Sequence, residues 1–303
     1  MVIDFSCKHD ILIKNPDGTF SRMDEPYFHA EKIAPDTWMI LSSGDYAYLL
    51  AGDKEAVAID TGYGAGNIRQ FMQTLTDKPV RNVFNTHSHF DHTANNAYFE
   101  KAYMAKKAVP LATEPYASFC GINFPKDYIH VGIAEGFQYD LGGRILEVFD
   151  IPDHTDDGIA LLDRRNRLLI TGDEFMPLPM GKRLRRVTVK TFSGYLDKLM
   201  AHRSEFDRLL CGGGVQDAAL LDDYDACAKA ILSGAAGQPW QPPKHGGPAP
   251  MAPGPNGETV YDRIRPHAGD GGAGKPEPPG NYFCLRMGCA QIIYDRDMQF
   301  SAT

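Results

Sequence analysis

The sequence predicts a mixed α/β fold, and three observations support this class. Between residues 56 and 86, a strand-like run, a helix-like run and a second strand-like run follow one another, the order from which parallel strand pairs are built. Short apolar runs elsewhere repeatedly end on histidine or aspartate, as expected for functional loops at strand ends. The 303 residues are 43% hydrophobic and 23% charged, an ordinary balance for a chain that buries a core.

The first half of the chain is predicted to contain three short strands, a helix and a fourth strand. The three strands cover residues 38–43, 46–52 and 56–62, with Gly-Asp turns between them. The helix covers 67–75, where apolar residues recur at the spacing of one helix face. A buried strand over 80–86 then leads directly into a group of histidines, so this group occupies a functional position at a strand end.

The second half repeats the pattern. Predicted strands cover residues 144–154, 158–163, 167–173 and 208–211, and predicted helices cover residues 195–206 and 220–232. The first of these strands ends in His154, and the third ends at Asp173. Polar candidates for a site therefore follow strands in both halves of the chain.

We predict a single domain over residues 1–303, with a Gly/Pro-rich insertion at about 236–280. Twenty-one of these 45 positions are Gly or Pro, which excludes regular structure over most of the segment. Residues 281–300 are apolar and strand-like again, so the segment is an insertion and not a tail. It is expected to fold over a cleft or to form a contact between subunits of a homo-oligomer, and one sequence does not separate these alternatives.

The charge and the N-terminus bear on partners and location. A formal net charge of -8 disfavours a nucleic-acid backbone as the main partner. The N-terminus lacks the pattern of a secretory signal, and no apolar run approaches the ~20 residues of a membrane span. We therefore expect a cytoplasmic protein that acts on a small molecule, with neither nucleic acid nor a membrane as partner.

The run "THSHFDH" is typical of a metal site. His87 and His89 are two positions apart, so an extended backbone projects both side chains to the same side. Asp91 and His92 follow on a turn and can be directed at a neighbouring point. Neutral imidazoles and carboxylates suit zinc, iron or manganese, and tetrahedral zinc takes three or four such ligands. A solvated polar loop is the alternative for this stretch.

Four ordered motifs give the chain a resemblance to the metallo-β-lactamase superfamily over roughly residues 35 to 235. They are "AVAIDTG" with Asp60, "THSHFDH", "PDHTDDG" with His154, and "TGD" with Asp173. The resemblance implies a four-layer αβ/βα sandwich that holds one or two Zn²⁺ ions, with Fe or Mn as alternatives. It also implies the ligand roles. His87, His89 and His154 hold one metal, Asp91 and His92 help to hold a second, and Asp173 bridges both.

The sequence departs from the family pattern at the fifth motif. A histidine usually ends that strand within Gly-His-Gly, whereas here "CGGG" places Gly213 at the corresponding position. Glycine offers no ligand atom. Cys211, His202, His245 and His267 are the residues that could replace this ligand. The alternative is a weak or empty second metal site.

The predicted function is a metal-dependent hydrolase of a small-molecule ester, lactone, thioester or amide. The metal brings the pKa of water towards ~7, and the activated water attacks the carbonyl. Asp91 is expected to orient this water and to move a proton to the leaving group. Asp173 is expected to fix the metal through its charge, and Asp60 to orient the ligands by hydrogen bonds.

Lactones and other esters are favoured over β-lactams because no periplasmic signal is visible, and thioester hydrolysis of the glyoxalase II type is a further option. The alternative class is a non-hydrolytic protein that retains the fold and binds a metal or ligand.

Lys182 belongs to a basic stretch at 176–190 that is expected either to receive an anionic substrate group or to form a solvated basic face. Asp153, Asp156 and Asp157 are expected to solvate a loop or to add negative charge near the metal.

Overall fold

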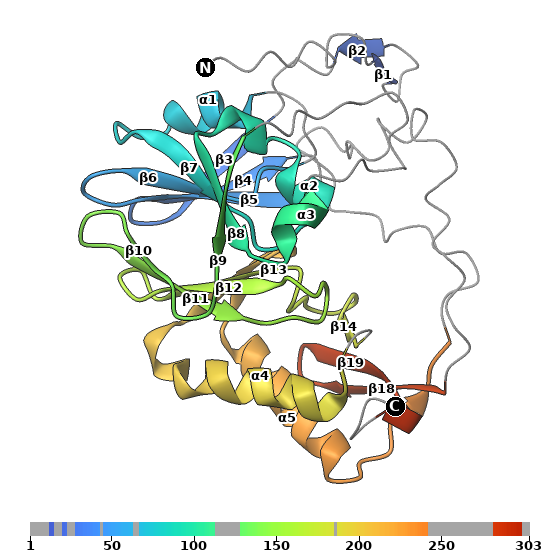
Figure 1. Cartoon of the computed structure of the whole chain (residues 1–303). Helices are drawn as coiled ribbons and strands as arrows, with labels where there is room; N and C mark the ends of the chain where they lie inside the picture. The colour runs from blue at the N-terminus through green and yellow to red at the C-terminus, as the bar shows by residue number, and fades with distance from the viewer. Residues whose placement is uncertain are drawn as a thin grey trace. The chain divides into compact units, whose positions relative to one another are not determined.

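The computed structural model describes residues 12–14, 20–22, 28–42, 45–62, 67–112, 128–184, 187–241 and 281–298. Its chain forms two compact units (Figure 1). Unit 1 comprises residues 1–133, 140–144 and 247–274, and unit 2 comprises residues 134–139, 145–246 and 275–303. Each unit is described by itself below, for the residues given above.

Unit 1 is built on a seven-stranded sheet in which the strands follow their order in the chain (Figure 1). The strands are β3 (His29–Ala34), β4 (Thr37–Ser42), β5 (Asp45–Ala51), β6 (Ala56–Ile59), β7 (Val80–Phe84), β8 (Lys101–Ala105) and β9 (Ile129–Ile133). Neighbours pair antiparallel from β3 to β6 and parallel from β6 to β9. The parallel β6–β7 pair confirms the strand, helix and strand order expected from the sequence. A separate antiparallel pair joins β1 (Leu12–Lys14) and β2 (Phe20–Arg22).

Short helices follow the parallel strands of unit 1. Helix α1 (Ile68–Gln73) lies between β6 and β7, and the Asn67 side chain caps it by accepting a hydrogen bond from the Gln70 amide. Helix α2 (Phe90–Thr93) and the 3₁₀ turn η2 (Asn96–Tyr98) follow β7, and α3 (Ala108–Ala112) follows β8. The histidine motif thus runs from the turn after β7 into α2, at the carboxyl end of a parallel strand.

Unit 2 contains two sheets. The larger has the strand order β10-β11-β12-β13-β15-β16, and the smaller has the order β14-β19-β18-β17. The larger sheet comprises β10 (Gln138–Asp140), β11 (Ile145–Asp150), β12 (Ile159–Asp163), β13 (Leu168–Gly172), β15 (Arg208–Cys211) and β16 (Gly214–Asp217). The smaller comprises β14 (Lys182–Arg183), β17 (Gln238–Pro239), β18 (Tyr282–Met287) and β19 (Ala290–Asp295). The parallel pair β13–β15 is connected through a helix, as is usual for parallel strands.

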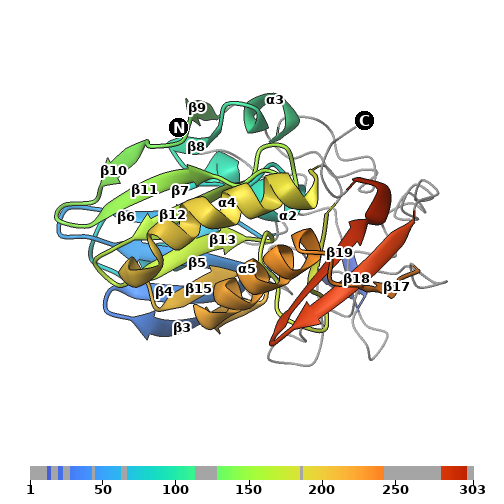
Figure 2. The same cartoon turned by 90° about the horizontal axis from the view of Figure 1, so that it is seen from below.

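Two long helices cover the larger sheet of unit 2. Helices α4 (Val189–Ala201) and α5 (Ala219–Leu232) lie side by side (Figure 2). Phe192 and Leu196 of α4 pack with Tyr224 of α5 in one buried cluster. Ile292 and Tyr294 of β19 belong to the same cluster, so the C-terminal hairpin contributes to the core of unit 2. Short 3₁₀ turns follow α4 and β19, at Arg203–Glu205 (η3) and Arg296–Met298 (η5).

Helix α4 begins earlier than the sequence predicts. The prediction placed its start at residue 195, whereas the helix begins at Val189, where the Thr188 hydroxyl accepts a hydrogen bond from the Thr191 amide. Ser193 and Gly194 have low intrinsic helix propensity, and the burial of Val189 and Phe192 outweighs it. Within the described residues, no helix has the length and apolar character needed to cross a membrane.

Candidate metal centre

Asp60 organises the polar side chains at the end of β6 in unit 1. It is buried, and its φ of 58° lies in the left-handed region that aspartate tolerates better than most residues. Its Oδ1 accepts a hydrogen bond from the Thr86 amide at 2.8 Å. Its Oδ2 accepts one from the Thr86 hydroxyl at 2.7 Å and lies 2.9 Å from Nδ1 of His92. Asp60 therefore fixes the residues on both sides of His87 and His89, as the sequence predicts for a residue that orients ligands.

These contacts determine which nitrogen of two imidazoles carries the proton. A carboxylate oxygen can only accept, so His92 donates from Nδ1 to Asp60 and presents Nε2 as its lone-pair nitrogen. The Thr86 hydroxyl uses its proton on Asp60, so it accepts from Nδ1 of His87 at 3.1 Å. His87 therefore also presents Nε2 as a lone-pair nitrogen. A lone pair of this kind is what a metal ligand needs.

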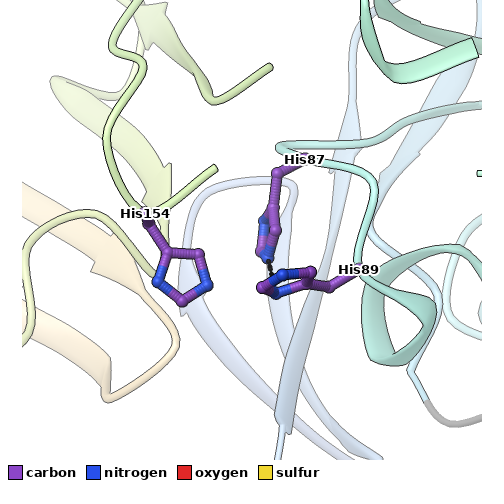
Figure 3. Close-up of side chains that lie close together, drawn as sticks. All are labelled: His87, His89 and His154. Atoms are coloured by element: carbon purple, nitrogen blue, oxygen red, sulfur yellow. Dashed lines mark hydrogen bonds between the residues drawn. The ribbon is translucent and has the colours of Figure 1, made fainter. Parts of the chain in front are cut away.

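His87 and His89 are drawn together in Figure 3, where a dashed line joins their rings. Nε2 of His87 lies 3.1 Å from Nδ1 of His89. Two nitrogens that bind one tetrahedral zinc ion at ~2.0–2.1 Å are roughly 3.3 Å apart. The observed separation is close to this value. Because Nε2 of His87 accepts, Nδ1 of His89 donates this hydrogen bond and would lose that proton for both nitrogens to bind one divalent ion.

Buried amides and hydroxyls support the loop that carries these histidines. The carbonyl oxygen of His92 accepts from the Asn85 side chain at 2.7 Å and from both the amide and the hydroxyl of Thr61 at 3.0 Å. Asn85 also exchanges two hydrogen bonds with the side chain of Asn96. Sequence reasoning missed these supporting residues. The available signal was the polar content of "NTH" and "TANN" on both sides of the motif, in segments that are otherwise buried.

Asp91 lies in the first turn of α2. One of its carboxylate oxygens is 3.9 Å from Nε2 of His92, and its side chain is 20% exposed. It is thus near a predicted ligand atom and also reachable by water. This position is compatible with both predicted roles of Asp91, metal ligand and proton carrier.

Unit 2 places the other two predicted ligands close together. His154 follows β11, Asp173 comes directly after β13, and Nε2 of His154 lies 3.5 Å from a carboxylate oxygen of Asp173. This separation also suits two ligands of one ion, since ligand atoms about a tetrahedral zinc are roughly 3.3 Å apart. The His154 amide donates to Oε2 of Glu174 at 3.0 Å, which ties the two loops to each other.

The basic stretch between Asp173 and α4 differs from its prediction. Lys182 was expected to meet an anionic substrate group or to lie on a solvated face, but it is buried and forms ion pairs with Asp153 and Glu174. Asp153 and Asp157 are likewise buried, so the loop before β12 is not solvated by them. Asp156 is exposed. Lys182, Asp153 and Glu174 pair with one another inside unit 2, a long-range pairing that local charge patterns do not reveal.

Two sets of side chains among the described residues have the type and number of ligand atoms that could hold a metal ion. One set is His87, His89 and His154, and the other is His87, His92 and Asp173. They contain five of the six predicted metal ligands. Asp91 belongs to neither set.

Four residues were suggested above as replacements for the fifth-motif histidine, and the structure describes two of them, Cys211 and His202. It supports neither as a ligand. Burial raises the pKa of the Cys211 thiol to about 12, and this thiol donates a hydrogen bond to the Gly214 carbonyl. Cys211 belongs to neither set of described side chains that could hold an ion, as given above. His202 contacts Glu205 through Nδ1 and packs on Phe149. His245 and His267 lie outside the described residues.

The two glycines between β15 and β16 have different surroundings. A Cβ atom on Gly212 would lie 2.1 Å from Oδ1 of Asp173, whereas one on Gly213 would lie 3.1 Å from Cδ of Pro177. A contact of 2.1 Å is impossible, so a side chain at Gly212 must displace the Asp173 carboxylate. Gly212 therefore allows the close approach of a predicted ligand.

Replacing Gly212 with alanine should lower metal content by displacing Asp173, with an effect of about 10-fold or more on metal affinity. The measurement is elemental analysis combined with chelator competition on purified protein. Gly213→Ala is the matched control, because its Cβ requires only a small shift of Pro177. Equal metal affinities in the two variants would contradict the role assigned to Gly212.

Comparison with known protein families matches residues 44–210 to the model described as "Metallo-beta-lactamase superfamily". A probable metallo-hydrolase of Streptococcus pyogenes serotype M6 is 25% identical over 153 residues, which cover 46% of this chain and 66% of the relative. The hydroxyacylglutathione hydrolase of Ruegeria pomeroyi is 29% identical over 181 residues, which cover 56% of this chain and 62% of the relative. The chain thus spans somewhat less than two thirds of the length of these relatives.

Solved structures support the same fold. A metallo-β-lactamase from Pontibacter korlensis aligns with a TM-score of 0.54 at 19% identity, over 67% of this chain and 99% of that one. A metallo-β-lactamase from Erythrobacter litoralis aligns with a TM-score of 0.52 at 14% identity, over 68% of this chain and 97% of that one. The predicted fold is therefore confirmed. The matched family model covers more than half of the sequence, and the chain belongs to the metallo-β-lactamase superfamily.

Proposed function

We propose that this protein is a metal-dependent hydrolase of a small-molecule ester, lactone, thioester or amide. The observation that carries the proposal is the pair His87 and His89, whose facing nitrogens are 3.1 Å apart. The hydrogen bonds from Asp60 through Thr86 orient His87 so that Nε2 carries the lone pair. Such an arrangement orients the lone pair of His87 before the cation arrives.

The proposed centre uses the two candidate ligand sets. His87 and His89 would hold one divalent ion together with His154, and His92 and Asp173 would hold or share a second. Zinc is the first choice because it accepts imidazole and carboxylate ligands, and iron or manganese would accept the same set. The lack of a side chain at Gly213 favours a weaker second site.

The ion would supply Lewis acidity, which lowers the pKa of water and polarises a carbonyl oxygen. The chain supplies orientation and proton transfer around it. Asp60 holds His92 and Thr86 by hydrogen bonds of 2.7–2.9 Å and so prevents rotation of the ligand rings. Asp91, whose carboxylate is partly exposed, is placed to take a proton on Oδ2 and to pass it to a leaving group.

A thioester or another activated ester is the substrate class with the best support. The relative from Ruegeria pomeroyi is named a hydroxyacylglutathione hydrolase, and the match covers more than half of this chain. Lactones remain within the proposal, because the same attack on a carbonyl opens them. Within the described part of the basic stretch, Lys182 is buried and paired with Asp153 and Glu174, so it does not offer its charge to an anionic substrate group.

A non-hydrolytic metal- or ligand-binding protein is the second candidate. The observation that favours it is the turn between β15 and β16, where Gly213 has no side chain and the protonated Cys211 points to a backbone carbonyl. A centre with fewer ligands could bind an ion without activating water efficiently.

The two candidates differ in metal content and turnover. Purified protein should contain about one equivalent or more of a divalent metal, and should hydrolyse a member of a panel of acylglutathione thioesters, aryl esters and lactones. Removal of the metal by a chelator should abolish turnover, and addition of Zn²⁺, Mn²⁺ or Fe²⁺ should restore it. Bound metal without turnover on the whole panel would favour the binding protein. Absence of both would overturn the proposed centre.

A further inference from the structure

A buried ion cluster in unit 2 has no role in the chemistry described so far. Nζ of Lys182 lies 3.0 Å from Oδ2 of Asp153 and 2.7 Å from Oε1 of Glu174. All three side chains are at most 4% exposed. Groups of this kind are rarely buried unless they are paired, since an unpaired buried charge is costly.

Each carboxylate of the cluster adjoins a predicted metal ligand. Asp153 directly precedes His154, and Glu174 directly follows Asp173. The second oxygen of Glu174 accepts the His154 amide at 3.0 Å. The second oxygen of Asp153 accepts the Val187 amide at 3.2 Å, just before α4. One ammonium group therefore connects the loop after β11 with the loop after β13.

The position of Lys182 is itself fixed by the C-terminal hairpin. Lys182 pairs with Ile292 in the parallel ladder between β14 and β19. The preceding Gly181 has a φ of +62°, and a Cβ atom there would lie 2.7 Å from Cβ of Gln291. The backbone thus approaches β19 closely, and this contact sets where the lysine side chain enters the cluster.

We infer that Lys182 is a positioning residue for the metal centre, acting on His154 through Asp153 and Glu174 and on Asp173 through Glu174. The inference rests on the proposed function, because it assumes that His154 and Asp173 bind the ion. It differs from a direct role, since Lys182 touches neither of these two side chains in the contacts described. The lysine holds the two ligand-bearing loops at a fixed separation.

The direction in which metal affinity changes when Lys182 is replaced distinguishes a positioning role from a purely electrostatic one. Replacing Lys182 with methionine removes a positive charge near the site, and by Coulomb's law alone this should strengthen the binding of a cation. If the lysine positions the loops, the same change should weaken binding despite the more negative surroundings. Partners that orient metal ligands are typically worth 10–100-fold in metal affinity.

The test compares Lys182→Met with the wild-type protein by chelator competition for Zn²⁺ and by the absorption spectrum of the Co²⁺-loaded protein. We expect a loss of about 10-fold or more in affinity and an altered Co²⁺ spectrum. The double variant Lys182→Met/Asp153→Asn removes one positive and one negative charge, so the formal charge of the cluster is preserved. It should still bind metal more weakly than the wild type, and it carries the test if the single variant does not fold.

Two controls account for surface charge and for stability. Lys229→Met removes a lysine whose side chain is 55% exposed and that pairs only with Asp197 and Asp225 in the described contacts. Leu199→Ala truncates a buried core residue of α4 outside the cluster. Both controls should retain wild-type metal affinity, although Leu199→Ala should lower the free energy of unfolding.

A metal-independent measurement separates this inference from the proposed function. In metal-free protein, the His154 amide should exchange with solvent faster in Lys182→Met than in Leu199→Ala, because its acceptor Glu174 is no longer held. If the wild type binds no metal, the proposed function fails, and the exchange rate still decides whether Lys182 orders the loop. Unchanged exchange, or metal affinity equal to or above that of the wild type, overturns the inference.

Discussion

Replacing His87 with alanine should remove the bound metal and abolish hydrolysis together. The substitution deletes a ligand whose Nε2 is oriented by Thr86 and Asp60 and faces His89 at 3.1 Å. His154→Ala should have the same effect, because the proposed ion needs both histidines. Loss of a direct ligand should exceed the ~10–100-fold effect of losing a residue that orients one. Elemental analysis and turnover of the best substrate in the panel provide the measurements.

Histidines outside the two candidate ligand sets serve as matched controls. His130→Ala in unit 1 and His202→Ala in unit 2 remove imidazoles of the same size, and neither belongs to a set of side chains that could hold an ion. Both should keep wild-type metal content and activity. Circular dichroism should show a native fold in every variant. Full metal content in His87→Ala would show that the ligand assignment is wrong.

Replacing Arg144 with methionine should cause the largest loss of stability. Arg144 is fully buried in unit 1, and its guanidinium donates to the carbonyls of Asp36 at 2.7 Å and Ala51 at 2.9 Å. It also donates to the Thr37 hydroxyl at 2.8 Å. Methionine fills part of the volume but leaves the three acceptors, of which those on Ala51 and Thr37 are buried, without their charged donor. We expect the free energy of unfolding to fall by about 3–5 kcal/mol.

Urea denaturation of the metal-free protein measures this loss directly. Arg81→Met is the control, because Arg81 has a 57% exposed side chain and pairs with Glu100 at 4.0 Å, where little stabilisation is expected. Equal unfolding midpoints for the two variants would contradict the role assigned to Arg144. Retained metal affinity in folded Arg144→Met would place its effect on stability and not on the site.

Site residues that are close together in the sequence could be predicted from the sequence. His87, His89, Asp91 and His92 lie within six consecutive positions, so their proximity follows from chain geometry. The hydrogen bonds of Asp60 to Thr86 and His92 span 26 and 32 residues, and the sequence indicated only that Asp60 would orient ligands. Their partners could not be identified, because they depend on the pairing of β6 with β7.

The ion cluster of unit 2 shows the limit of local charge patterns. Lys182 lies 29 positions from Asp153, and its neighbours Arg183, Arg185 and Arg186 made the whole stretch resemble a solvated basic loop. The decisive fact is the pairing of β14 with β19, which buries the lysine. A two-residue strand of this kind has no periodicity from which it could be predicted.

Secondary structure was likewise predicted best where the local sequence carries a clear pattern. Strands with continuous apolar runs, such as β6, β12 and β13, were predicted nearly in full. Strand β9 was missed because its sequence "IHVGI" combines an exposed isoleucine with histidine and glycine, so neither alternation nor a buried run is visible. The identity of the metal, the small-molecule substrate, the cytoplasmic location and the oligomeric state stay predictions.

The hairpin of β18 and β19 lies beyond residue 210, where the recognisable family match ends. It nevertheless supplies Ala290, Ile292 and Tyr294 to the apolar interior of unit 2 and provides the strand partner of Lys182. A chain truncated just before β18 would therefore expose the face of α5 that packs on β18 and β19, and would remove the strand partner of Lys182. The β18–β19 hairpin is therefore part of the hydrophobic core of unit 2, although it lies outside the matched family region.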